Sequence, residues 1–179
     1  MSEIIVFGFG SLMKIKSLRA TVPDAHTIRP AYIKGFRRDF SVWDSVGYTK
    51  TEISVGLAGQ PYCAVDVRVA ASLAMRVNGV VFSIGANSLP SLMEREQNYK
   101  LIKTTAYDFE SEDKIGECLV FSANKDNGQY AFNSAIQTYY LNECLEGAKK
   151  LGERFYQEFL NSTFISDKPL DAIPGLLDI

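Results

Sequence analysis

The sequence contains a single histidine, and this scarcity limits the chemistry that the protein can perform. A histidine-rich zinc site is excluded, and any Ser-His or Cys-His nucleophile would have to use His26. His26 lies in a polar stretch, residues 23–27, between the first two expected strands, so we expect it in a surface loop. If the protein is an enzyme, carboxylates are the expected proton-transfer groups.

Cysteine is also scarce. Cys63, Cys118 and Cys144 lie far apart and are odd in number, so they form neither a disulfide framework nor a Cys-x-x-Cys site. We expect them to be small core residues in a reducing compartment. With no cluster of metal-ligand spacing in the sequence, we expect no metal and no cofactor.

Long runs of basic residues and long runs of apolar residues are absent as well. No basic run is longer than Arg37-Arg38, and the net charge of −2 argues against a nucleic-acid partner. No apolar run approaches membrane-spanning length, so no membrane partner is expected. The first seven residues lack a basic segment followed by an apolar core, so we expect them to form a first strand and not a signal peptide. The protein is therefore expected to be cytoplasmic.

The 179 residues, 46% of them hydrophobic, suit one domain over residues 1–179. Strand patterns dominate the first two thirds and do not alternate regularly with helices, which favours an α+β sheet or small barrel with helices outside. Strands are expected at 4–9, 28–43 with a break at Gly35, 62–69, 78–84, 101–109 and 116–123. Helices are expected at 15–20, 89–99, 133–148 and 151–160, a loop or weak hairpin at 47–59, and irregular coil at 167–179.

A glycine-rich turn, residues 8–12, directly follows the first expected strand. Two glycines allow a sharp turn that presents consecutive backbone N–H groups to an anion or a carbonyl oxygen. A dinucleotide fingerprint would need a third glycine where Met13 stands, and no Gly-Lys-Ser/Thr follows. A plain tight turn explains this segment at least as well.

The expected helix at 89–99 carries a carboxylate on its apolar side. At about 100° per residue, the side chains of Leu89, Leu92, Met93 and Tyr99 share one face, and Glu96 projects between Leu92 and Met93. Burial would raise the pKa of this carboxyl, as a general base requires. The alternative is a structural ion pair with the arginine at position 37, 38, 68 or 95, and Glu94 should point the other way.

Four motifs in order resemble the γ-glutamylcyclotransferase superfamily, which includes the ChaC-type proteins. They are the aromatic-Gly-Ser-Leu turn at Phe9, Gly10, Ser11 and Leu12, a G-[YF]-x-R-x-F strand at 35–40, a G-V-[VL]-[YF]-x-[IV] strand at 79–84, and an L-x-x-R-E-x-x-Y helix at 92–99. The resemblance covers about the first hundred residues. The C-terminal helix adds a looser match at Tyr140 and Gly147, with Tyr139 as an adjacent alternative.

The resemblance implies a small mixed β-barrel with flanking helices and a cyclisation that turns a γ-glutamyl amine or peptide into 5-oxoproline. Backbone N–H groups of the turn would hold the γ-glutamyl group, Glu96 would be the catalytic acid/base, and Tyr140 would reach the substrate. Metal, nucleotide and nucleophilic Ser or Cys are not needed for this reaction.

Two departures from the family pattern leave the substrate open: Phe9 replaces the usual Tyr, and Gln97-Asn98 replaces the commoner Lys-Gly. The alternatives are the same fold acting on another modified amine or an isopeptide, and a small-molecule binding protein without turnover. The sequence leaves the oligomeric state open.

Overall fold

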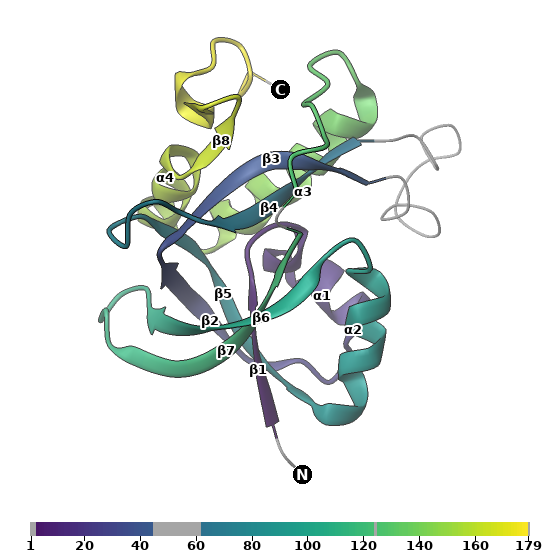
Figure 1. The fold of residues 1–179 in the computed structure, drawn as a ribbon, viewed down its shortest axis with the longest axis vertical. Coiled ribbons are helices and arrows are strands. Elements are labelled where there is room, and N and C mark those ends of the chain that lie inside the picture. Colours follow the sequence, from purple (N-terminus) through teal and green to yellow (C-terminus); the bar gives the residue numbers. More distant parts are fainter. Residues whose placement is uncertain (1–2, 45–61, 124, 179) are drawn as a thin grey trace.

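The computed structural model describes residues 3–44, 62–123 and 125–178, in which a closed five-stranded barrel lies beside a four-stranded sheet (Figure 1). The loop or weak hairpin expected at 47–59 lies outside the described residues.

The barrel has the strand order β1-β5-β2-β6-β7 and closes where β7 meets β1. That closing pair is parallel and the other pairs are antiparallel, so the predicted α+β fold with a small mixed barrel is confirmed. The strands are β1 (Glu3–Gly8), β2 (His26–Lys34), β5 (Arg76–Gly85), β6 (Lys100–Asp108) and β7 (Lys114–Ser122).

Strand β5 is central to the barrel because both of its faces are buried, as its nearly continuous apolar sequence requires. Gly79 allows β1 to approach closely, since a Cβ at this position would lie 2.3 Å from the carbonyl oxygen of Gly8. The end of β1, where the glycine turn begins, is therefore held tightly against β5.

The second sheet has the order β4-β3-β8-β9, with β3 (Phe36–Asp44), β4 (Tyr62–Val69), β8 (Thr163–Ile165) and β9 (Lys168–Pro169). The break expected at Gly35 is present, and its consequence is larger than a kink. Gly35 has a φ of +77°, and the chain leaves the barrel there and enters the other sheet. The coil expected at 167–179 is wrong in part, because β9 and a short 3₁₀ turn, Leu170–Ala172, lie within it.

The helices are α1 (Ile15–Thr21), α2 (Leu89–Arg95), α3 (Ala135–Lys150) and α4 (Glu153–Asn161). In Figure 1, α1 and α2 lie together on one side of the barrel, and α3 and α4 accompany the second sheet. The expected helix at 89–99 is too long, since α2 ends at Arg95. His26 is exposed as expected, but it begins β2 instead of lying in a loop. The three cysteines are buried and unpaired, as expected.

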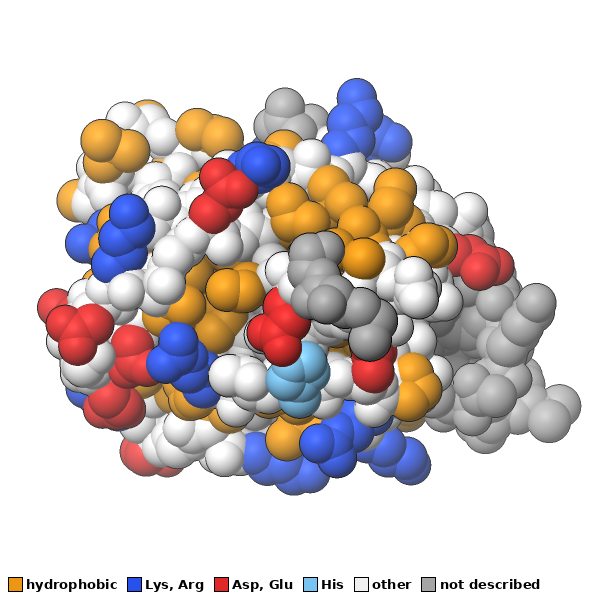
Figure 2. Space-filling model, turned by 90° about the horizontal axis from the view of Figure 1, so that it is seen from below, with side chains coloured by type: hydrophobic (Ala, Val, Ile, Leu, Met, Phe, Trp, Pro, Cys, Tyr) orange, Lys and Arg blue, Asp and Glu red, His pale blue; other side chains and the backbone are white. Residues whose placement is uncertain are grey.

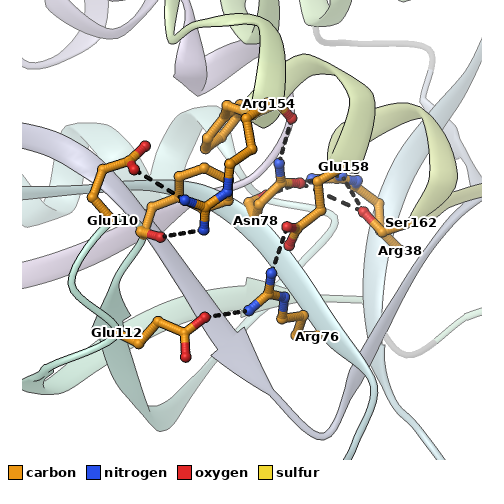
Figure 3. Close-up of polar contacts among 10 residues, drawn as sticks. Arg38, Arg76, Asn78, Glu110, Glu112, Arg154, Glu158 and Ser162 are labelled. Carbon is orange, nitrogen blue, oxygen red and sulfur yellow. Dashed lines mark hydrogen bonds and ion pairs between the residues drawn. The ribbon is translucent and has the colours of Figure 1, made fainter.

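Ion pairs fasten α4 to the barrel (Figure 3). The guanidinium of Arg76 contacts Glu158 of α4 at 2.6 Å and Glu112 of the β6–β7 turn at 3.3 Å. Arg154 reaches the same turn from α4, with its guanidinium 3.0 Å from Glu110. The C-terminal helix is thus connected to two parts of the barrel that are distant in the sequence.

On the face of the molecule seen in Figure 2, basic and acidic side chains are interspersed and apolar side chains gather between them. This face therefore carries no continuous surface of one charge. None of the helices in the described part of the chain is long and apolar enough to cross a membrane.

Candidate active site

The turn after β1 is shaped by Gly10. The chain leaves β1 at Gly8 and enters a 3₁₀ turn, Ser11–Met13, which is closed by the Met13 N–H donating to the Gly10 carbonyl at 2.9 Å. A Cβ at Gly10 would lie 2.7 Å from Cγ2 of Val65 and 3.2 Å from the Tyr140 hydroxyl, so only glycine fits without rearrangement. Within the described residues, the N–H groups of Gly10 and Ser11 donate no hydrogen bond. The turn therefore presents two available donors.

Glu96 is the first residue after α2, and its N–H still donates to the carbonyl of Leu92 at 2.9 Å. Its side chain is 17% exposed, so the expected burial is largely present. Leu92 is fully buried and Glu94 is exposed, as expected. The prediction that Met93 lies on the buried apolar face is wrong, because its side chain is 49% exposed. A helix of only seven residues buries a narrow stripe, and Met93 falls outside it.

Arg95 forms the ion pair with Glu96, its Nε lying 3.2 Å from Oε1. The same guanidinium donates to the hydroxyls of Ser11, Ser17 and Thr21 at 3.1, 2.9 and 2.7 Å, respectively. Of the four arginines considered as partners of Glu96, Arg95 is therefore the one in place. It connects the carboxylate with the glycine turn and with α1.

The pKa of Glu96 is raised above its ordinary value, mainly because burial disfavours the charged form. The positive charge of Arg95 and its hydrogen bond oppose this shift, and the negative charge of Asp44 adds to it. The net direction is upward, so the ion pair does not cancel the effect of burial.

Two tyrosines hold the same strand residue beside Glu96. The Tyr99 hydroxyl donates to the carbonyl of Val65 at 2.8 Å, and the Val65 N–H donates to the Tyr140 hydroxyl at 3.2 Å. Tyr140 is buried and lines the cavity, whereas Tyr139 packs half-buried against the core and does not line it. Burial and the carboxylate of Glu96 raise the pKa of Tyr99, which keeps this hydroxyl protonated.

These groups surround two adjoining cavities that share Ser11, Glu96, Tyr99 and Tyr140. Every site residue singled out from the sequence lines the first cavity: Phe9, Gly10, Ser11, Leu12, Glu96 and Tyr140. Residues separated by more than 120 positions in the chain are thus brought together, while their roles remain predictions.

The second cavity contains residues that sequence reasoning missed, among them Asp44 and Tyr62. The buried carboxylate of Asp44 accepts hydrogen bonds from the Tyr62 hydroxyl at 3.0 Å and from the Asn98 amide at 3.4 Å. In the sequence, only the position of Asp44 directly after the strand expected to end at position 43 could have indicated a site residue, and a polar residue after a strand is common. Its proximity to Glu96 depends on the fold.

Among residues 3–44, 62–123 and 125–178, no group of three or more His, Cys, Asp or Glu side chains could hold a metal ion. The groups at the cavity that could take part in a reaction are the carboxylate of Glu96, whose pKa is raised, and the backbone N–H groups of Gly10 and Ser11. A carboxylate of this kind can accept and return a proton, and such donors can stabilise developing negative charge on a carbonyl oxygen.

A family model described as "ChaC-like protein" matches residues 4–141 of the sequence. No curated protein matches it significantly. Among solved structures, one titled gamma-glutamyl cyclotransferase is 21% identical with a TM-score of 0.66, covering 93% of this chain and 91% of that one. An uncharacterized protein from Homo sapiens is 17% identical with a TM-score of 0.65, covering 99% and 98%.

A third solved structure is similar, a cyclotransferase from yeast whose title calls it specific to glutathione. It is 16% identical with a TM-score of 0.57, covering 99% of this chain and 95% of that one. At these identities the solved structures show a common fold, and the family match adds the sequence relationship.

Proposed function

We propose that this chain, which belongs to the ChaC-like protein family, is a γ-glutamylcyclotransferase that converts a γ-glutamyl amine or peptide into 5-oxoproline and a free amine. The observation that carries the proposal is Glu96, a partly buried carboxylate with a raised pKa, in one cavity with Gly10 and Ser11, whose N–H groups donate no hydrogen bond within the described residues. The family membership and the shared fold with solved cyclotransferases support it.

In the proposed reaction the substrate's α-amine attacks its own γ-carbonyl carbon. A new carbon–nitrogen bond closes a five-membered lactam, and the bond from that carbon to the leaving nitrogen breaks. Because nucleophile and electrophile share one molecule, the protein mainly has to hold the reactive conformer, and effective molarities of about 10⁵–10⁸ M are reached in oriented systems of this kind.

Glu96 has the role of proton carrier. The α-amine is an ammonium at neutral pH, so it must lose a proton before it attacks, and the departing nitrogen must gain one. A carboxylate whose pKa lies closer to neutral can do both, an effect of about 10²–10⁴-fold. No step requires a metal or a cofactor.

The N–H groups of Gly10 and Ser11 have the role of stabilising the carbonyl oxygen. Negative charge develops on this oxygen as the α-amine adds to the carbon. Donors that are already oriented and hold no other partner in the described structure need no reorganisation when that charge appears.

The test is to incubate the purified protein with glutathione and with a panel of γ-glutamyl amines, including γ-glutamyl-ε-lysine, and to detect 5-oxoproline by mass spectrometry. We expect at least one substrate to be converted by the wild type and not measurably by Glu96→Gln. Conversion of a modified amine or isopeptide alone would identify that substrate class. Binding of these compounds without any 5-oxoproline would overturn the enzymatic proposal in favour of a binding protein.

A further inference from the structure

Arg38 of β3 is fully buried and donates hydrogen bonds from all three of its guanidinium nitrogens. Nε donates to the Thr163 hydroxyl at 2.7 Å, and Nη2 donates to the Asn78 side chain at 2.9 Å and to the Ser162 hydroxyl at 3.1 Å. Figure 3 shows Arg38 reaching Asn78 and Ser162 at the end of α4. The remaining nitrogen, Nη1, donates to the carbonyls of Asn78 at 2.6 Å and Phe9 at 3.1 Å.

Burying the Arg38 guanidinium costs desolvation free energy, which a close carboxylate would normally offset. Among the residues described, no carboxylate lies within ion-pair distance of Arg38. Neutral oxygens and the ring of Phe159 contact the guanidinium, and the negative charge of Glu158 acts on it from farther away. Burial lowers the pKa of Arg38 to about 9, which still leaves it protonated at neutral pH. Joining these elements does not by itself require a charge, because well-packed apolar residues often replace buried charged groups without loss of stability.

The contact with Phe9 points to a use for this charge. The Phe9 carbonyl and the Gly10 N–H belong to the same peptide group. A donor at the carbonyl oxygen withdraws electron density from the amide and makes its N–H a stronger donor. That N–H has no acceptor among the described residues, and Gly10 lines the cavity with Glu96.

We propose that Arg38 is a positioning residue that fixes and polarises the Phe9–Gly10 peptide, so that the Gly10 N–H stabilises the negative charge formed on the substrate's carbonyl oxygen. This inference rests on the proposed function. Arg38 acts from behind the turn and does not touch the substrate. The hydrogen bond from Nη1 to the Asn78 carbonyl fixes the guanidinium to β5. Through this bond, Arg38 holds the turn in a defined position relative to the barrel.

Ser162 offers a test that leaves Arg38 in place. Ser162→Asp puts a carboxylate beside Nη2 and offsets the positive charge, whereas Ser162→Asn has nearly the same shape and no charge. We expect kcat for 5-oxoproline formation to be about five- to tenfold lower in Ser162→Asp than in Ser162→Asn, because one oxyanion donor is weakened but not removed. KM should differ by less than about twofold.

The polarisation itself can be measured without turnover. In ¹H–¹⁵N spectra, the resonance of the Gly10 amide proton should move upfield in Ser162→Asp relative to Ser162→Asn. If Arg38→Lys folds, the same resonance should move upfield relative to the wild type. Thr163→Val, which removes the acceptor of Nε but leaves the Phe9 contact, should lower the melting temperature without changing kcat.

The outcomes separate the two proposals. If the wild type forms no 5-oxoproline from any substrate, the proposed function fails, and the Gly10 resonance still tests the polarisation. If the wild type is active but Ser162→Asp and Ser162→Asn share the same kcat and the same Gly10 resonance, Arg38 is structural only and the inference is wrong.

Discussion

Glu96 lies between two opposing influences, and the balance decides whether it can act as a base. Arg95 lies 3.2 Å away and stabilises the ionised carboxylate, as in a structural ion pair. Burial and the nearby carboxylate of Asp44 act in the opposite direction, and together they raise its pKa. Because Arg95 divides its donors among Ser11, Ser17 and Thr21 as well, it orients Glu96 without neutralising the effect of burial.

Glu96→Gln tests the catalytic assignment. The amide keeps the shape and the ability to hydrogen-bond but cannot accept and return a proton near neutral pH, so kcat for 5-oxoproline formation should fall by about 100-fold or more while the fold persists. Glu94→Gln, on the exposed side of α2, is the matched control and should retain wild-type kcat. Near-normal turnover of Glu96→Gln with a clearly lower melting temperature would make Glu96 an ion-pair partner and not a base.

The turn gives a second test, because its backbone and its one hydroxyl have different predicted roles. Gly10→Val places methyl groups where Val65 and the Tyr140 hydroxyl already lie, so kcat/KM should fall by at least about 100-fold, as for loss of an oxyanion donor. Ser11→Ala removes only the acceptor of an Arg95 hydrogen bond, and we expect a loss of less than about tenfold. Equal, complete losses in steady-state kinetics would instead assign a direct role to the Ser11 hydroxyl.

Much of the first cavity could be predicted from the sequence, because its residues lie in motifs with local signatures. A glycine pair after a strand predicts a turn with available N–H groups, and a carboxylate among apolar helix positions predicts a perturbed pKa. The positions of Arg38 and Asp44 could not be predicted in this way. Their roles depend on which strand ends meet in space, and nothing in residues 35–44 shows that Arg38 reaches the Phe9 carbonyl.

Helix α3 brings Tyr140 to the site by docking against the 3₁₀ turn, and Gly147 makes this docking possible. A Cβ at Gly147 would lie 3.0–3.1 Å from the backbone of Lys14 and Met13. Lys14 in turn pairs with Glu143 and Glu146 of the same helix. Tyr140 and Gly147 are seven positions apart, which is about two helical turns, so both lie on the docked side.

Gly147→Val should therefore disturb both stability and activity. Overpacking costs about 1–3 kcal/mol, which corresponds to a melting temperature lower by about 2–12 °C for a chain of this size. Displacement of Tyr140 should also lower kcat/KM. Ala135→Val, at the exposed first residue of α3, adds the same kind of side chain away from the docked face and should change the melting temperature by no more than about 2 °C. If both variants behave alike, docking at Gly147 does not position the site.

The elements differ in how well the sequence predicts them. Barrel strands such as β5 carry continuous apolar runs and are found within one or two residues of their true ends. In the second sheet, β3 and β4 are predicted equally well, whereas β8 is not, because it has three residues and pairs in parallel with β3 from more than 120 positions away. Such a strand exists only because its partner supplies the other half of the hydrogen bonds.

Considered as a whole, the molecule buries Glu96, the proposed catalytic carboxylate, at a cost to its own stability. Removing Glu96 from water favours its neutral form in the native state, whereas in the unfolded chain the carboxyl titrates near its ordinary pKa of about 4.5. Below that pH both states are protonated and Glu96 contributes nothing. Above it the unfolded state ionises first, so the native state holds more protons and the free energy of unfolding falls as pH rises towards the native pKa.

The last prediction follows from this sign. The free energy of unfolding of Glu96→Gln, measured by urea denaturation between pH 4 and pH 8, should equal that of the wild type near pH 4 and exceed it increasingly as pH rises, until the native carboxyl is also ionised. Glu94→Gln controls for the removal of a negative charge as such and should show no such growing advantage. If Glu96→Gln loses stability relative to the wild type as pH rises, the attraction of Arg95 outweighs burial. The pKa of Glu96 is then lowered, and a carboxylate of that kind is poorly suited to carry the proton in the proposed cyclisation.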